Sequence, residues 1–148
     1  MSQVLSTKYL LDALAAIKSQ VLDTAVPAHC HIHLAKPPFT PNPTSDPASF
    51  TEADYTGYAA VTITAWDNPA LTPADLAEIV GTTVAQFRPT GTTVTNSIAG
   101  FWVLDAAGDF VFAQVFSTPV ALTGPNTVLS IVPRWQQAPS AWLFDVIG

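Results

Sequence analysis

The chain has 148 residues, of which 49% are hydrophobic and only 11% are charged, and its formal net charge is −6. That length fits one domain, residues 1–148, which is large enough to bury a core without a metal or a disulfide. The charged fraction is well below the roughly 25% of typical soluble domains, so much of the surface must be uncharged, as in proteins that pack against copies of themselves or a partner. The acidic balance disfavours phosphate backbones, and we expect no direct nucleic-acid contact.

Cysteine usage and the chain start indicate where the protein folds. Cys30 is the single cysteine, so an intrachain disulfide is impossible. The first residues lack the basic region of a signal peptide, and no apolar run approaches the roughly 20 residues of a membrane span. We therefore expect folding in a cytosol and no membrane partner.

The first expected element is an amphipathic helix at residues 7–24. Leu10, Leu14, Ile17 and Val21 recur at intervals of four, three and four, which places them on one helical face. Two roles are open for this stripe: it closes one end of the chain's own β core, which is the commoner use, or it docks on a neighbouring subunit.

Residues 28–35 then alternate as a half-buried strand does. His29, His31 and His33 fall on one face, opposite Cys30 and its alternate neighbours. Five prolines keep residues 37–49 out of regular structure and predict a long, stiff, partly polyproline arm that reaches a neighbouring subunit.

Residues 50–66 are expected to form an acidic, aromatic turn followed by a strand. Glu52, Asp54 and Gly57 suit the turn, and the β-branched residues from Val61 suit the strand. In the segment 71–80, Thr72 is a helix cap and Pro73 suits the first helical position, so we expect a helix of one or two turns that links two strands.

From residue 82 onward the chain predicts one strand after another. Asp105–Asp109 is expected to be a hairpin loop, and Thr123–Asn126 a second tight turn. The expected strands are 83–88, 97–104, 110–117, 120–123, 127–132 and a final one at 142–146. With about eight strands, the predicted fold is mainly β: an antiparallel β-sandwich or jelly roll at 28–135, with the N-terminal helix as an accessory and an apolar tail at 136–148.

The three histidines are the sharpest chemical feature. Residues two apart on a strand point the same way, so His29, His31 and His33 include pairs able to share a metal ion. A metal enzyme of the cupin type needs a Glu a few residues later and a further His, and the chain has neither. We expect polar imidazoles on a solvent or interface face, able to respond to pH, and no metal or cofactor. A metal site shared between subunits on a symmetry axis is the alternative.

No other residues assemble into a catalytic set. Cys30 points away from the histidines on a regular strand, and the sequence contains no Gly-x-Ser-x-Gly motif. Glu52 and Asp54 are too close in a turn to act as a glycosidase pair. We therefore expect that the protein is not an enzyme.

Aromatic residues are the remaining candidates for function. Because Phe101 and Trp102 are consecutive in a strand, they face opposite sides, and one of them is expected to leave the core. Exposed aromatics suit either a protein interface or a glycan-binding platform, and scarce charge favours the interface. The tail either adds a strand to its own sheet or lies on a neighbour. The interface candidates are Pro38, Phe39, Pro41, Trp102, Trp142 and Phe144.

Three runs of the sequence, Phe50–Ile63, Gly100–Asp109 and Thr118–Pro133, resemble small β-rich virion proteins of tailed bacteriophages, of the head decoration or capsid cement type. The resemblance covers roughly residues 28–135. It implies a structural protein that is assembled in the host cytoplasm, forms a homo-oligomer, with a trimer favoured, and stabilises the lattice of the major capsid protein. A tail or neck component, a receptor- or glycan-binding module and, last, a cupin-like metalloenzyme are the alternatives.

Overall fold

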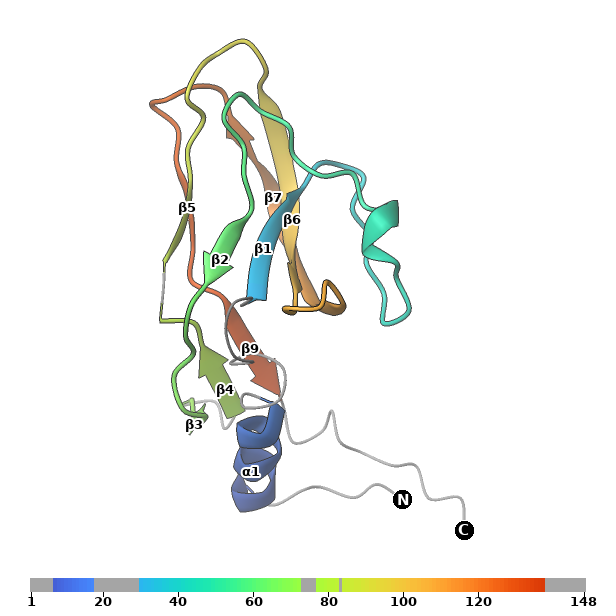
Figure 1. The fold of residues 1–148 in the computed structure, drawn as a ribbon, viewed down its shortest axis with the longest axis vertical. Coiled ribbons are helices and arrows are strands. Elements are labelled where there is room, and N and C mark those ends of the chain that lie inside the picture. The colour runs from blue at the N-terminus through green and yellow to red at the C-terminus, as the bar shows by residue number, and fades with distance from the viewer. Residues whose placement is uncertain (1–6, 18–29, 73–76, 83, 138–148) are drawn as a thin grey trace.

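The structure is a computed structural model that describes residues 7–17, 30–72, 77–82 and 84–137. These residues form one α-helix, one short 3-10 helix and nine strands, drawn in Figure 1. In chain order they are α1 (Thr7–Ile17), β1 (Cys30–Ala35), η2 (Pro47–Ser49), β2 (Val61–Ile63), β3 (Ala70–Leu71), β4 (Ala77–Val80), β5 (Ala85–Phe87), β6 (Asn96–Leu104), β7 (Phe110–Leu122), β8 (Leu129–Ile131) and β9 (Arg134–Gln137).

The strands make three sheets, with the orders β2-β1-β6-β7, β3-β4-β9 and β5-β8. Every pairing between them is antiparallel. The prediction of a mainly β, antiparallel protein is therefore confirmed. None of the described helices is long and apolar enough to cross a membrane.

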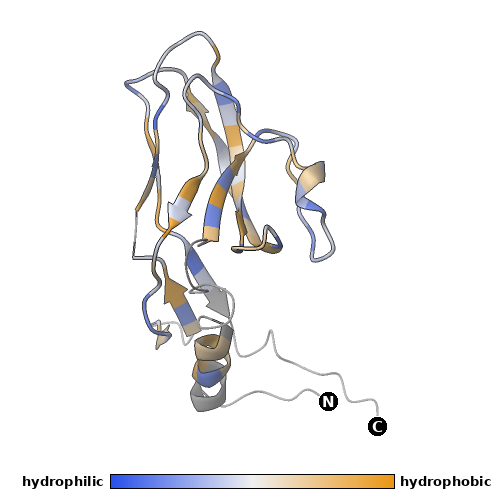
Figure 2. Cartoon of the chain, in the orientation of Figure 1, coloured by the Kyte–Doolittle hydropathy of each residue, from blue (hydrophilic) through white to orange (hydrophobic). Residues whose placement is uncertain are grey.

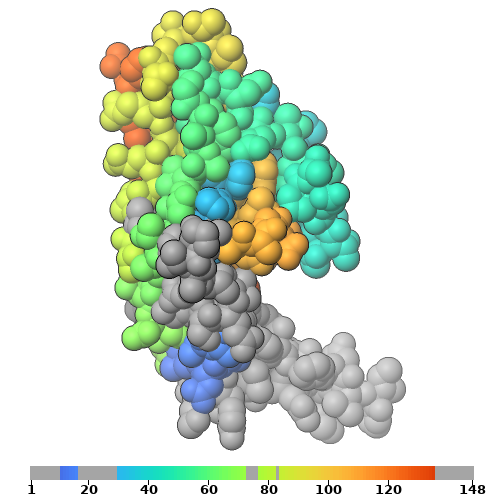
Figure 3. All heavy atoms as spheres, in the orientation of Figure 1, coloured from blue at the N-terminus to red at the C-terminus, as the bar shows by residue number. Residues whose placement is uncertain are grey.

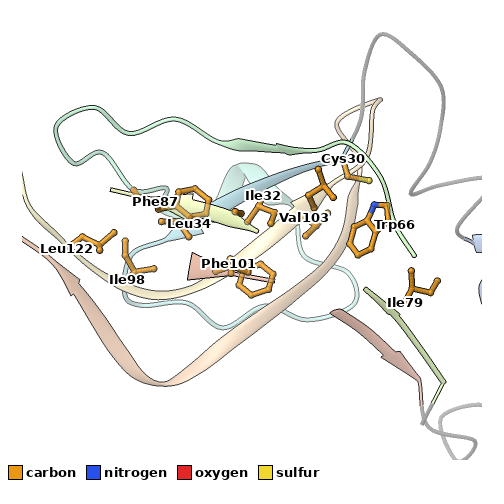
Figure 4. Close-up of a cluster of buried hydrophobic side chains, with 14 of the residues drawn as sticks. Cys30, Ile32, Leu34, Trp66, Ile79, Phe87, Ile98, Phe101, Val103 and Leu122 are labelled. Atoms are coloured by element: carbon orange, nitrogen blue, oxygen red, sulfur yellow. The ribbon is translucent and has the colours of Figure 1, made fainter. Parts of the chain in front are cut away.

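The main core lies on one face of the four-stranded sheet. The alternation predicted for β1 is present: Cys30, Ile32 and Leu34 are fully buried, whereas His31 and His33 are half-buried. Figure 2 shows this alternation as bands of orange and blue along β1. Because neighbouring β6 keeps the same period, its Phe101 and Val103 reach the same core as Ile32, as Figure 4 shows.

All three sheets contribute to that core. Ile79 comes from β4, Phe87 from β5 and Ile131 from β8, and all three belong to one buried cluster with the residues of β1 and β6. Leu14 of α1 is fully buried in the same cluster. The described part of the helix therefore packs on its own chain, at the end of the fold where β4 lies (Figure 1), while residues 18–24 of the predicted helix lie outside the described residues.

The prediction of a helix within residues 71–80 is wrong for the part of this segment that the structure describes. Ala77–Val80 is strand β4, which pairs with β3 and with β9, a strand that the sequence did not predict. Ala77 and Ile79 are fully buried and alternate with half-buried neighbours. Pairing on both sides and this burial outweigh the helix-capping signal of Thr72, which is a weak local preference.

The break predicted between residues 117 and 120 is also wrong. β7 runs through Pro119, but its register with β6 shifts there: Gly100 pairs with Val115, and Ile98 pairs with Val120. The extra residues bulge from the ladder. Pro119 is tolerated because β7 is an edge strand, where a missing N–H costs no ladder bond.

The predicted turn chemistry is confirmed at two positions. The Asp105–Asp109 loop joins β6 to β7, with Gly108 at φ +88° and an Asp105 N–H donating to the Asp109 carbonyl at 2.9 Å. Gly57, in the turn before β2, has φ +86°. Both glycines occupy the left-handed region, which side chains disfavour.

Candidate functional site

The face of the large sheet opposite the main core is covered by the proline-rich arm, which we define as residues 37–50. Trp102 of β6 pairs with His33 of β1, and both side chains lie on this face. With Ala35, Phe39 and Ala99, Trp102 forms a second buried cluster. The root of the arm, by which we mean the residues near its two ends, therefore packs on the sheet of its own chain.

Aromatic rings fasten the root of the arm. Phe39 and Phe50, near its two ends, meet edge to face with ring centres 5.0 Å apart. The Phe50 ring centre lies 5.1 Å from that of Trp102, and His33 stacks on Trp102 at 5.3 Å with an angle of 11° between the planes. Such pairs add about 0.5–1.5 kcal/mol each beyond the area that they bury.

Gly100 allows this close packing. A Cβ built at Gly100 would collide with the backbone oxygen of Gln114 and would lie 2.8 Å from Phe39 Cδ1. Gly100 lies within β6, beside the register shift between Ile98 and Gly100, at a position where the Phe39 ring crosses the backbone.

A polar network ties the residues that follow the arm in the sequence to β1. His33 Nδ1 lies 2.6 Å from Glu52 Oε1, so the carboxylate accepts a hydrogen bond from the imidazole N–H. The Tyr58 hydroxyl donates to the same oxygen at 2.8 Å and accepts from the Leu34 N–H at 3.0 Å. The Ala53 N–H also donates to the Leu34 carbonyl at 2.9 Å.

The two tyrosines beside this network have raised pKa values. Burial raises the pKa of Tyr55 to about 12. Burial, and then the nearby Glu52 carboxylate, raise the pKa of Tyr58 well above the usual range, although its bond from Leu34 acts in the opposite direction. Both phenols therefore stay neutral to a higher pH than an exposed tyrosine does.

A second polar cluster holds the other side of the arm's root. Asn96 is only 9% exposed, and its Oδ1 accepts from the N–H groups of Asp54 at 2.8 Å and Tyr55 at 2.9 Å. Its Nδ2 donates to Asp54 Oδ1 at 2.8 Å, and Lys36 Nζ lies 2.9 Å from the same oxygen. The bonds from Lys36 and Asn96 lower the pKa of Asp54.

Two of the three histidines considered as metal ligands have other side-chain partners. His31 Nδ1 lies 3.2 Å from the Thr62 hydroxyl, and His33 is bound by Glu52. His29 lies outside the described residues. Within the described part of the chain, no group of three or more His, Cys, Asp or Glu side chains is arranged to hold a metal ion. Cys30 is buried on the opposite face, so it forms no dyad with His33. The contacts of His33 with Glu52 and Trp102 fix the orientation of its ring.

Two of the predicted interface residues need correction. Phe39 is 5% exposed and Trp102 is 3% exposed, so their side chains are buried within this chain. Trp102 does leave the main core, as the alternation predicted, but the arm covers it. Pro38 is exposed and Pro41 is half-buried, while Trp142 and Phe144 lie outside the described residues.

The sequence missed the partner of His33. Glu52 is separated from it by the whole arm, but the chain returns antiparallel to β1, so that Ala35 and Glu52 form a bridge. The sequence did contain a signal for this return of the chain. A strand leads into the arm, and turn-forming residues follow it, as expected when a chain comes back to the same sheet.

The outer part of the arm projects beside the β6–β7 hairpin (Figures 1 and 3). η2 lies within it, with Asp46 capping its first turn by accepting from the Ala48 N–H at 3.0 Å. Between the arm and the sheets is a groove of about 560 Å³, lined by Pro41, Asn42, Pro43, Phe110, Val111, Phe112, Ala113 and Trp135. The fold thus presents a clamped arm with an open groove at its side.

No protein-family model, no curated protein and no solved structure matches this chain.

Proposed function

We propose that this chain is a structural protein of a tailed-bacteriophage virion, of the head decoration or capsid cement type. Its fold is then an antiparallel sandwich of the jelly-roll kind, for which the support is that all three sheets share one core. The sequence resemblance over residues 28–135 motivates the class of protein. The clamped arm supplies the means of contact.

The observation that carries this proposal is the contrast between the two parts of the arm. Its root is held by buried rings and by the bonds of Glu52, whereas the residues from Pro37 to Ser45 include no charged side chain. Its outer residues Pro38, Thr40 and Pro43 are exposed. A stiff, uncharged projection loses little conformational entropy when it docks on another protein.

The partners proposed are copies of the same chain, with a trimer favoured, and the major capsid protein. The protein then resides in the virion after assembly in the host cytoplasm and acts without a cofactor or catalysis. A neck or tail component uses the same kind of contact on a different part of the particle.

Co-sedimentation with capsids of the phage that encodes the chain tests this proposal. Thr40→Asp with Pro43→Asp puts charges on the outer arm and leaves the buried root intact, so we expect the capsid-bound fraction to fall at least tenfold. The matched control is Thr92→Asp with Asn126→Asp, at exposed loop positions remote from the arm. A strictly monomeric protein with no affinity for capsids would contradict the proposal.

The glycan-binding alternative loses its simplest platform, because Trp102 is buried beneath the arm. A metal-dependent cupin reaction loses its ligand set among the described residues, where His33 is bound to Glu52. Elemental analysis of protein purified without chelator tests that last alternative directly, since a stoichiometric metal would revive it.

A further inference from the structure

The groove beside the arm is longer than the arm itself suggests. A second hollow of about 390 Å³ adjoins it and shares three of its lining residues, Phe112, Ala113 and Trp135. The other residues that line this second hollow are Gln114 and Arg134. The two hollows therefore make one elongated groove between β7, β9 and the arm, which we call the β7–β9 groove.

Two aromatic rings lie where the hollows meet. The ring centres of Phe112 and Trp135 are 5.6 Å apart, with an angle of 50° between the planes. Both side chains are half-buried, pack against the main core and line both hollows. The core therefore holds the rings in place, and their negative faces can attract the slightly positive C–H groups of a sugar ring.

Three planar polar side chains line the groove around these rings. Asn42 Oδ1 accepts from the N–H and the hydroxyl of Thr44, both at 2.9 Å, which fixes the amide and leaves its Nδ2 without a partner among the described residues. The exposed Gln114 amide makes no bond within the same part of the chain. Arg134 Nη1 donates to Glu78 Oε1 at 3.0 Å, which orients the guanidinium. The remaining N–H groups suit the oxygens of a polyhydroxylated ligand.

The charges favour a neutral ligand. The Glu78 carboxylate offsets the charge of Arg134, and the whole chain has a net charge of −6, so an anionic chain would be repelled. We propose that the β7–β9 groove binds a neutral oligosaccharide, which stacks on Trp135 and accepts hydrogen bonds from Asn42, Gln114 and Arg134. This site is separate from Trp102, and the activity goes beyond the virion role.

A titration of the isolated full-length protein, followed by amide NMR, tests the proposal. The probes are neutral hexasaccharides of glucose, xylose, mannose and N-acetylglucosamine, each at about 10 mM, where a site with a Kd of about 1 mM is mostly filled. We expect at least one probe to shift the amide signals of residues 110–114 and the indole signal of Trp135. Unshifted signals with every probe, or shifts confined to other surfaces, would overturn the proposal.

A variant with unchanged side-chain shapes tests the polar contacts. Asn42→Asp with Gln114→Glu replaces N–H donors by oxygen and keeps the acceptor for Thr44, so the Kd of the bound hexasaccharide should rise about tenfold or more. The matched control makes the same two changes, Gln86→Glu with Asn126→Asp, at exposed positions outside the groove. An unchanged Kd in the groove variant, or an equal rise in the control, would contradict the assigned contacts.

Trp135→Leu tests the stacking and should abolish the shifts. Because Trp135 also packs on the core, the amide spectrum must first show that this variant is folded. The exposed pair Asn42→Asp and Gln114→Glu decides the proposal if it is not. None of these measurements involves capsids, so this proposal and the virion role fail separately.

An acidic probe tests the preference for a neutral ligand. A hexasaccharide of galacturonic acid should bind more weakly than the best neutral probe, because the net charge of the chain is −6. Tighter binding of the acidic probe would overturn the proposal of a neutral oligosaccharide.

Discussion

His33 Nδ1 and Glu52 Oε1 lie 2.6 Å apart and close the base of an arm that separates the two residues along the sequence. Around this pair, stacked rings and the Tyr58 hydroxyl hold both ends of the arm to one sheet. The same arm leaves residues 38–45, which include no charged side chain, beside an open groove.

Gly100→Ala should destabilise the fold by about 1–3 kcal/mol, the usual cost of overpacking. The new methyl group meets the Gln114 carbonyl oxygen and the Phe39 ring, and the backbone oxygen cannot move without disturbing β7. Chemical denaturation measures the loss. Gly124→Ala is the control, because its methyl group would approach only a flexible side-chain carbon, Thr92 Cγ2 at 3.1 Å. Equal stability of the two variants would contradict this account of Gly100.

Phe39→Ala should cost about 3–5 kcal/mol, as truncations of buried phenylalanines do. The ring packs against Phe50 and Trp102, so its loss frees the root of the arm. Limited proteolysis should then cut within residues 37–50 much faster. Thr40→Ala, at the exposed position on the other side of Phe39, should leave the cleavage rate unchanged. A similar rate in both variants would mean that Phe39 does not hold the arm.

Protonation of Asp54 should make the protein less stable in acid. Its pKa is lowered in the folded state from the ordinary 3.8 by the bonds from Lys36 and Asn96. A carboxylate with a lowered folded pKa stabilises the fold above the unfolded value, and that contribution is lost as the pH falls through the folded value. The melting temperature of Asp54→Asn should therefore depend less on pH below 3.8 than that of the native chain.

The matched partner variant for this acid effect is Lys36→Met, which removes the largest cause of the shift. It should flatten the acid dependence in the same direction. Native dependence in both variants would show that the Lys36–Asp54 pair contributes nothing in solution, as is common for exposed ion pairs.

Ionisation of Tyr55 should weaken the fold in alkali. Its folded pKa of about 12 lies above the ordinary 10.0, so the neutral phenol stabilises the fold below pH 10.0, and this contribution disappears as the pH rises through 12. Tyrosinate absorbance should show a late step coupled to unfolding. Tyr55→Phe should reduce the amplitude of that step and leave the part that Tyr58 contributes, whereas an unchanged titration curve in this variant would show that Tyr55 is solvated.

The sequence predicted the strands that have strong local patterns and missed those that depend on distant partners. Alternation identified β1, and turn glycines located the β6–β7 loop. β4 and β9 stabilise each other across a long stretch of chain, so neither has a local signal. Pro119 suggested a break, but an edge position and a bulge accommodate it within β7.

The candidate site shows the same limit. The alternation of His31 and His33 and the division of Phe101 from Trp102 were predictable because period two is a local property. The return of the arm over Trp102 could not be predicted from the sequence, because it depends on packing between Phe39, Phe50 and a glycine on another strand. The apolar character of these residues therefore suggested an interface, where the structure has a second core.

Electron cryomicroscopy of the particle that carries this protein is the most direct test of the central claim that the arm joins neighbouring subunits of a virion. The account predicts copies of the chain on the head surface, with residues 38–45 of each arm in contact with an adjacent subunit. Particles that lack the chain, or arms directed into solvent in every copy, would contradict it.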